Sequence, residues 1–116
     1  MTIYLLDHGR KLMMKLNHLA AENDQVIRIL HFAEPESLLE SCLKECPDFI
    51  FIRLGETPFN GLTTARKVIA LYRDLKVVFI SRHLEYATLA WEAGGAGFLA
   101  EPLQEVLFKE LLERLT

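Results

Sequence analysis

Arg53 is the residue of this chain whose type and position point to chemistry most directly. It follows the run 48–52, Asp-Phe-Ile-Phe-Ile, which is the most apolar strand-like segment of the sequence. In open α/β sheets, ligands and reacting groups gather at the carboxyl ends of the strands. A guanidinium at such an end can bind an anion or pair with a carboxylate, but it cannot act as a nucleophile. The arginine therefore favours a binding or structural role over catalysis.

The cysteines and three of the four histidines give no comparable signal. Cys42 and Cys46 lie four residues apart in a helical pattern, which suits a disulfide poorly and offers too few ligands for zinc. We expect both to be reduced, as in cytosolic proteins, and buried or half-buried. His18, His31 and His83 are scattered along the chain, and we assign them no chemistry.

Composition limits the class of protein. The 116 residues are 51% hydrophobic, which is enough for one domain with one core. The net charge is −3 and basic residues do not cluster, so we expect no nucleic-acid contact by this domain. No apolar stretch approaches the ~20 residues that span a bilayer, and the first residues lack a basic leader. We therefore expect a cytoplasmic protein with no membrane contact.

Short apolar runs alternate with longer amphipathic segments five times. We expect strands at 3–6, 26–32, 49–52, 76–80 and 97–100, each followed by a helix, with a turn-rich loop at 55–61. The second predicted helix begins near Pro35 and buries a stripe of Leu38, Leu39, Cys42 and Leu43. The last two helices are expected at 84–93 and 103–115. Five such units predict a doubly wound, flavodoxin-like parallel sheet of order 2-1-3-4-5 with five helices.

This order of units and several motifs resemble the receiver domain of bacterial two-component response regulators. The similarity is closest to receivers that precede LytTR-type effectors, and it extends from Met1 to the last helix. The motifs are Pro47-Asp48-Phe49-Ile50-Phe51-Ile52, Val78-Phe79-Ile80-Ser81, Glu85-Tyr86-Ala87 with Glu92-Ala93-Gly94, and Gly97-Phe98-Leu99. The resemblance implies one receiver-like domain, 1–116, which either stands alone or forms the N-terminal part of a longer regulator.

The resemblance also implies a phosphorylation pocket at the strand ends, and here the residues depart from the family. Receivers end the first strand with an acidic pair that helps to hold Mg²⁺, whereas this chain has Asp7 and His8. Arg53 stands where receivers have the aspartate that accepts the phosphoryl group. Neither a metal nor a cofactor is therefore expected, and the domain is not expected to be an enzyme.

Three further positions complete the implied pocket. Ser81 keeps the hydroxyl that receivers use to bond phosphoryl oxygens, and Phe98 fills the position of their aromatic switch residue. Glu101-Pro102 replaces the Lys-Pro pair, so the acceptor and the lysine have exchanged the sign of their charge. We expect Arg53 to pair with Glu101, with Asp7 as a second carboxylate. A solvated arginine in an inactive pocket, or an anion site formed with Ser81, are the alternatives.

These inferences favour a degenerate pseudo-receiver: a phosphorylation-independent interaction module in signal transduction or transcriptional control. Its partner would be another protein, an effector domain or a second copy. Tyr86, Trp91 and Phe98 lie where receivers dimerise or dock an effector, on the fourth helix, fifth strand and fifth helix. Large aromatic residues there are more often core than interface. The alternative function is a sensor that binds a small anionic ligand in the former phosphorylation pocket.

Overall fold

A computed structural model describes residues 1–26 and 28–116. The strands are β1 (Thr2–Leu6), β2 (Arg28–Phe32), β3 (Phe49–Arg53), β4 (Lys76–Ser81) and β5 (Gly97–Ala100). The helices that follow them are α1 (Lys11–Ala21), α2 (Pro35–Lys44), α3 (Phe59–Leu71), α4 (Ala87–Glu92) and α5 (Glu105–Leu115). A short 3₁₀ turn, η1 (Leu84–Tyr86), precedes α4.

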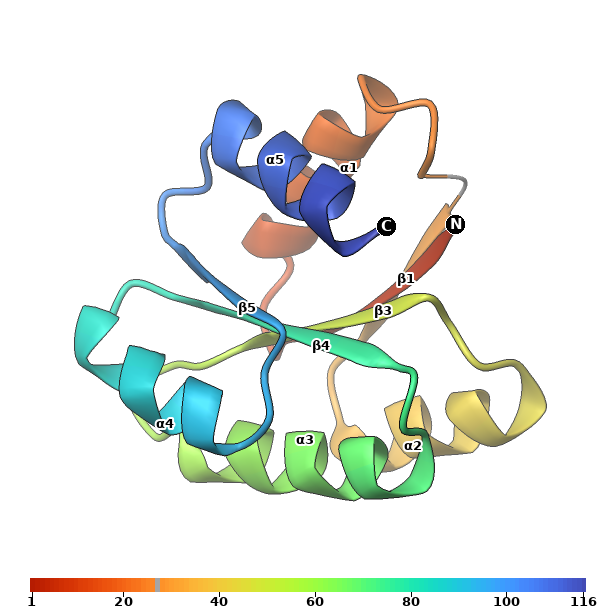
Figure 1. The fold of residues 1–116 in the computed structure, drawn as a ribbon, viewed down its shortest axis with the longest axis vertical. Helices are drawn as coiled ribbons and strands as arrows, with labels where there is room; N and C mark the ends of the chain where they lie inside the picture. Colours follow the sequence, from red (N-terminus) through yellow and green to blue (C-terminus); the bar gives the residue numbers. More distant parts are fainter. Residues whose placement is uncertain (27) are drawn as a thin grey trace.

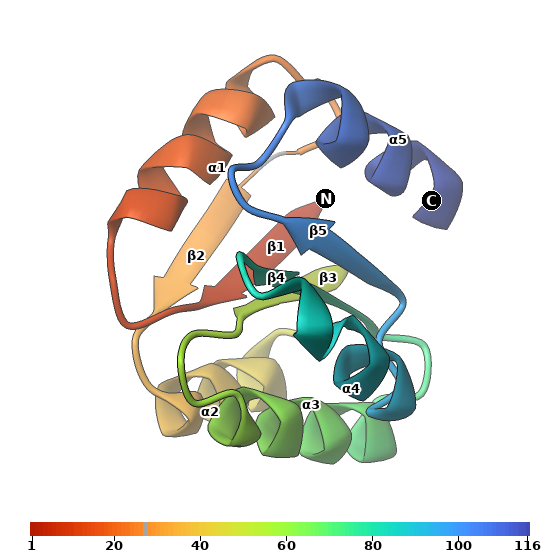
Figure 2. The ribbon, with the colours of Figure 1, turned by 90° about the vertical axis from the view of Figure 1, so that its left-hand side faces the viewer.

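The strands form one parallel sheet in the order β2-β1-β3-β4-β5. Helices α1 and α5 cover one face of the sheet, and α2, α3 and α4 cover the other (Figures 1 and 2). This arrangement confirms the predicted flavodoxin-like, doubly wound fold. Because all the strands point the same way, their carboxyl ends meet at one edge of the sheet, where functional groups are expected.

The central strand shows how the sequence specifies the two cores. In β3, Ile50 and Ile52 pack with α2, α3 and α4, whereas Phe49 and Phe51 pack with α1 and α5. Successive side chains of a strand point to opposite faces, so a strand covered on both faces must be apolar throughout. Arg53 ends this run because it reaches the edge of the sheet, where solvent replaces the helices.

Helix α2 corrects one prediction. Leu38 and Cys42 are buried and Leu39 is half-buried, but Leu43 is 78% exposed rather than part of the buried stripe. The predicted apolar stripe is wider than the surface of α2 that packs on the sheet, because the sheet covers only the side of the helix that carries Leu38 and Cys42. Leu43 lies beyond the edge of that contact and remains on the surface.

Helix α3 corrects a second prediction. It begins at Phe59, directly after Pro58, so the predicted loop 55–61 is shorter and Gly61 lies in the first helical turn. A Cβ atom at Gly61 would lie 2.7 Å from Leu54 Cδ2 and 3.0 Å from Ile52 Cγ2. The glycine therefore allows α3 to approach β3 closely, and it does not serve a turn.

Other boundaries differ slightly. The predicted second strand, 26–32, includes Ile27, which lies outside the described residues, and the observed β2 begins at Arg28. The predicted helix 84–93 divides into η1 and α4, and Gly94 follows with a φ of 93°. In the described part of the chain, no helix has the length and apolar character needed to cross a membrane.

Candidate functional site

Three strand ends bring charged side chains together at the carboxyl edge of the sheet. Leu6 pairs with Ile52 in the register of β1 and β3, so Asp7 follows β1 beside Arg53. Glu101 follows β5, and the end of β4 lies between it and β3. Arg53 lies two and four residues after Phe51 and Phe49 in β3, and alternate side chains of a strand share a face. Its side chain therefore points to the face of the sheet that α1 and α5 cover.

Arg53 forms the expected ion pair with Glu101. Its Nε donates a hydrogen bond of 2.7 Å to Glu101 Oε1, and its Nη1 lies 3.8 Å from Asp7 Oδ1. The side chains are 25% exposed for Arg53, 21% for Glu101 and 7% for Asp7. The guanidinium is therefore neutralised by two carboxylates and is not a solvated charge. This geometry is a charge-assisted hydrogen bond with a second, longer contact.

Asp7 is fixed by its own backbone as well as by the arginine. Its N–H donates to the carbonyl oxygen of Phe32, at 3.0 Å, and its carbonyl oxygen lies 2.7 Å from His31 Nε2. His31 thus contributes to the edge of β1, although its sequence position gave no such indication. Among residues 1–26 and 28–116, no group of three or more His, Cys, Asp or Glu side chains is placed to hold a metal ion.

His8 takes no part in this arrangement. Its side chain is 82% exposed, and Nδ1 lies 3.8 Å from Glu34 Oε1 on the surface. It stands where the resemblance places the second acid of a Mg²⁺-binding pair. An exposed imidazole cannot replace the hard, anionic oxygen that Mg²⁺ prefers.

Ser81 is brought to the same edge, but its hydroxyl is already used. The residue is fully buried, its Oγ donates to the carbonyl oxygen of Leu54 at 2.7 Å, and it accepts from the N–H of His83 at 3.0 Å. Ser81 points to the same face of the sheet as Val77 and Phe79, whereas Arg53 points to the other face, with Phe51. Ser81 thus links the backbone of the loop after β3 to that of the loop after β4. An anion could bond its hydroxyl only by displacing these hydrogen bonds.

A cavity of about 280 Å³ opens above Asp7 and Arg53, between the loops that follow β1, β2 and β3. Its charged lining consists of Asp7, Glu34, Arg53 and Glu56, and the imidazole of His8 also lines it. Three carboxylates thus face one guanidinium, which is already paired with Glu101 outside the lining. Glu56 was not singled out from the sequence, although its place in the loop after the strand that carries Arg53 was a usable signal.

The loops after β3 and β4 are tied together beside this cavity. His83 Nε2 lies 3.2 Å from Glu56 Oε1, and its Nδ1 lies 3.7 Å from Glu85 Oε1. The ring of Tyr86 packs against the imidazole with centroids 5.2 Å apart, and its hydroxyl donates to the carbonyl oxygen of Glu56 at 3.1 Å. His83, to which the sequence assigned no role, therefore connects two loops of the candidate site.

The aromatic residues of the predicted interface differ in exposure. Phe98 is half-buried on β5 and pairs in register with Phe79, and Tyr86 is also half-buried. Trp91 is 76% exposed on α4, contrary to the expectation that aromatic residues in this region are more often core. The exposure arises because α4 is short and buries only Ala90. Leu84, Val106 and Leu107 add apolar surface at η1 and α5.

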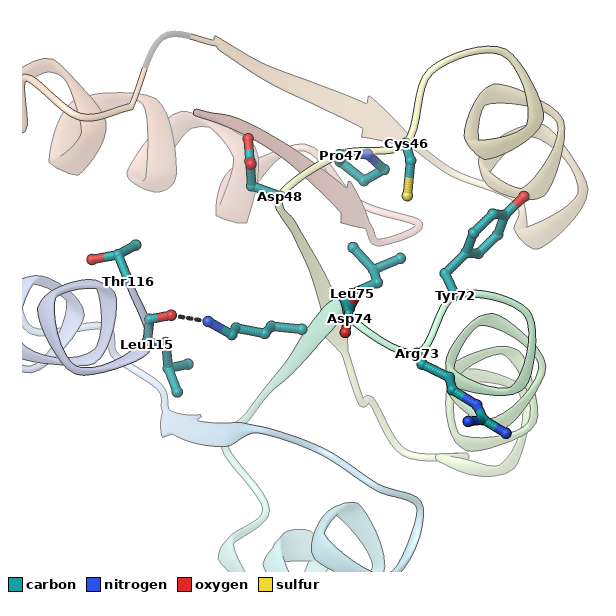
Figure 3. A pocket seen from close by; sticks show the side chains of 10 residues that line it. Cys46, Pro47, Asp48, Tyr72, Arg73, Asp74, Leu75, Leu115 and Thr116 are labelled. Atoms are coloured by element: carbon teal, nitrogen blue, oxygen red, sulfur yellow. Dashed lines mark hydrogen bonds between the residues drawn. The ribbon is translucent and has the colours of Figure 1, made fainter.

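A larger cavity, of about 540 Å³, lies at the opposite edge of the sheet. Figure 3 shows Cys46 and Tyr72 on one side of it and the last residues of α5 on the other. Lys76 donates a hydrogen bond from its ammonium group to the carbonyl oxygen of Leu115 and so anchors the end of α5. This cavity faces the amino ends of the strands, and it contains none of the residues predicted to form a site.

No protein-family model matches the chain. It is 29% identical over 98% of its length to an uncharacterized response regulatory protein of Vibrio cholerae. It is 25% identical over 99% of its length to the transcriptional activator protein ExaE of Pseudomonas putida, and 20% identical over 98% to the sensory transduction protein LytT of Enterococcus faecalis. These matches cover 44%, 55% and 47% of the relatives, so the chain spans about half their length.

Two solved structures with the same fold are domains of response regulators. The response regulatory domain of MrkE from Klebsiella pneumoniae superposes with a TM-score of 0.85 at 21% identity, over 99% of this chain and 94% of that one. The receiver domain of NtrX from Brucella abortus gives 0.85 at 19% identity, over 97% and 96%. At this identity the comparison establishes the fold, which is that of a receiver domain.

Proposed function

We propose that this chain is a pseudo-receiver, a receiver-type domain of a response regulator that signals through protein contacts without accepting a phosphoryl group. The observation that carries this proposal is the 2.7 Å contact between Arg53 Nε and Glu101 Oε1. By resemblance, these two residues stand at the positions of the acceptor aspartate and its lysine. Their ion pair holds the strand ends together without a phosphate or a metal.

The chemistry of the pocket supports the same proposal. Phosphoryl transfer to a receiver requires a carboxylate nucleophile and a divalent cation that neutralises the transferred charge. Arg53 has no nucleophilic oxygen, and Asp7 lies 3.8 Å from its guanidinium, which supplies positive charge where a cation would bind. The hydroxyl of Ser81 is held by Leu54 and His83. At the positions of Asp7, Arg53 and Ser81, the groups that would accept or stabilise a phosphoryl group are thus either replaced or already bonded to other residues.

Incubation with acetyl phosphate and Mg²⁺, followed by intact-mass measurement, tests the proposal. The wild-type mass should remain unchanged. A restored variant with His8→Asp, Arg53→Asp and Glu101→Lys should gain the mass of one phosphoryl group, because it regains an acceptor, a second acid and a lysine. A stoichiometric gain by the wild type, located at this pocket, would contradict the proposal.

We further propose that the surface of α4, β5 and α5 docks the protein partner or effector domain. Trp91 is 76% exposed on α4, and Leu84 of η1 and Val106 and Leu107 of α5 are exposed apolar side chains on the same set of elements or beside it. Exposed aromatic residues beside apolar ones are typical of the centres of interfaces. In a signalling assay of the whole protein that contains this chain, Trp91→Ala should reduce output with an unchanged Tm, whereas Met14→Ala on α1, where Met14 is 71% exposed, should have no effect. Equal output from both variants would exclude this surface.

The alternative of an anion sensor in the cavity above Arg53 is less well supported. The carboxylates of Asp7, Glu34 and Glu56 line that cavity, and the guanidinium is already paired. An entering anion would have to compete with Glu101 for Arg53 and would be repelled by three carboxylates. A saturable rise in Tm with phosphate or citrate that Arg53→Met abolishes would favour this alternative.

A further inference from the structure

We propose that the groove between α2 and α3 is a self-association surface, where two copies of this chain pair about a two-fold axis. The α2–α3 groove is lined by Leu39 and Leu43 of α2, by Lys67, Ala70 and Leu71 of α3, and by Tyr72. Its volume is about 380 Å³. This surface is distinct from the pocket at Arg53 and from the surface around Trp91.

Two side chains of the α2–α3 groove, Leu43 and Leu71, are exposed, whereas Leu39 and Tyr72 pack against the core beneath it. Leu43 is 78% exposed and Leu71 is 67% exposed, and together they extend the half-buried Leu39 onto the surface. Spacings of four residues, Leu39 to Leu43 and Lys67 to Leu71, align these side chains along the two helices. A contiguous apolar groove on two neighbouring helices is the kind of surface that another helix covers.

The charges beside the groove identify a second copy as the occupant. Glu36 and Glu40 are exposed along α2, with Lys44 at its last residue, whereas Arg66 and Lys67 are exposed on α3. A partner that matches this surface must present an apolar centre with basic groups opposite α2 and acidic groups opposite α3. The α2–α3 groove itself has this pattern, so the surface is complementary to itself, as an isologous dimer requires.

The topology selects one orientation of the pair. Both helices connect parallel strands, so α2 and α3 run in the same direction along the same face of the sheet (Figure 1). A two-fold axis parallel to the helices places α2 of one copy opposite α3 of the other, which joins acidic to basic residues. A two-fold axis perpendicular to the helices places α2 against α2, which opposes like charges. The charge pattern therefore favours the first arrangement.

Self-association at this groove leaves the surface proposed for the partner free. In Figure 2, α3 lies between α2 and α4, and both views place the three helices on one face of the sheet. Trp91, Val106 and Leu107 lie outside the α2–α3 groove. The inference does not depend on the proposed function, because it would hold equally for a receiver that accepts phosphate.

Sedimentation equilibrium of the 116-residue chain over a range of concentrations provides the test. The wild type should show a reversible monomer–dimer equilibrium. Leu43→Glu should raise the dissociation constant about tenfold or more, and it should fold normally because Leu43 is exposed. Trp91→Ala should leave the constant unchanged. A wild type that remains monomeric at millimolar concentration would overturn the proposal, as would a dimer that only Trp91→Ala dissociates.

A charge exchange tests the orientation. Glu40→Lys and Lys67→Glu should each weaken the dimer, because each places like charges opposite one another twice in a two-fold pair. The double variant should recover most of the wild-type affinity, since the exchanged pair again places opposite charges against one another at both copies of the contact. Additive weakening in the double variant would overturn the parallel-axis arrangement.

Discussion

The Arg53–Glu101 ion pair has an intermediate environment, with 25% and 21% of the two side chains exposed. Exposed ion pairs contribute about 1 kcal/mol or less, whereas breaking a fully buried pair costs about 3–5 kcal/mol. Asp7, at 7% exposure, would also lose its nearest cation if Arg53 were removed. The arginine should therefore matter more to stability than the glutamate does.

A double-mutant cycle on Arg53→Ala and Glu101→Ala should give a coupling energy of about 2 kcal/mol in urea denaturation. Arg28 and Glu45 form the matched control, because their ion pair has a similar distance of 2.8 Å but exposures of 46% and 61%. Their coupling should stay below about 1 kcal/mol. Equal coupling in the two cycles would show that the Arg53 pair is as well solvated as a surface pair.

The two cysteine thiols should differ in reactivity. Burial raises the pKa of Cys42 from an ordinary 9.0 to about 11, with a smaller contribution from Cys46. Cys46 is exposed, which corrects the expectation that both thiols are buried or half-buried; partial desolvation and then Asp48 raise its pKa. Thiolates react with alkylating reagents and thiols do not. Iodoacetamide at pH 8 should therefore modify Cys46 slowly and Cys42 only after unfolding, as read by mass spectrometry. Equal labelling of the native protein would contradict this.

The raised pKa of Cys42 also affects stability at high pH. The folded state holds this proton more tightly than the unfolded state, so unfolding releases it between pH 9 and about 11. The contribution is fully present below pH 9 and is lost as pH rises through about 11. The free energy of unfolding should fall over this interval, and the fall should be shallower in Cys42→Ala. An unchanged slope would assign the effect to another group.

At the scale of elements, the contact between α3 and β3 depends on Gly61. A Cβ atom there would meet Leu54 at 2.7 Å and Ile52 at 3.0 Å, and both of these side chains are buried. Gly61→Ala should destabilise the protein by about 1 kcal/mol, because overpacking outweighs the gain in helix propensity. Gly55→Ala is the control, since nothing lies within 4 Å of its added Cβ. Thermal denaturation that ranks the two variants equally would contradict this close contact.

The elements that could be predicted best from the sequence are the strands that are buried along their whole length and on both faces. Apolar runs such as Phe49 to Ile52 predicted the strands, because a strand covered on both faces leaves a continuous signal. Leu43 was misplaced because helical spacing gives the direction of an apolar stripe but not the width that the sheet covers. Gly61 was assigned to a turn because glycine is found both in turns and where a helix packs closely on a strand, as α3 packs on β3.

The candidate site could be predicted only where strand ends determine it. Asp7, Arg53 and Glu101 each lie at or directly after a strand, so the fold alone brings them to one edge. The contacts of His83 and Glu56 could not be predicted, because they join two loops whose paths depend on tertiary packing. The bonds of Ser81 to the backbone depend on the same loops.

At the scale of the whole molecule, a receiver fold combines the Arg53–Glu101 ion pair with two exposed apolar surfaces. In our account the pocket is held by the Arg53–Glu101 pair, the surface at Trp91 docks a partner, and the α2–α3 groove pairs two copies. The chain spans about half the length of the curated relatives it matches. A domain with a fixed pocket can still act as a regulator if the amount of its partner protein, or of the domain itself, determines how much of it is bound.

The most direct test of the fixed pocket is a titration with beryllofluoride and Mg²⁺, which mimic a bound phosphoryl group, followed by ¹H–¹⁵N NMR. The amide signals around Asp7, Arg53 and Ser81, and those of the loop that carries His83, should not move. The restored variant with His8→Asp, Arg53→Asp and Glu101→Lys should respond at the same positions. Saturable shifts in the wild-type pocket would contradict the central claim that this receiver fold signals without phosphate.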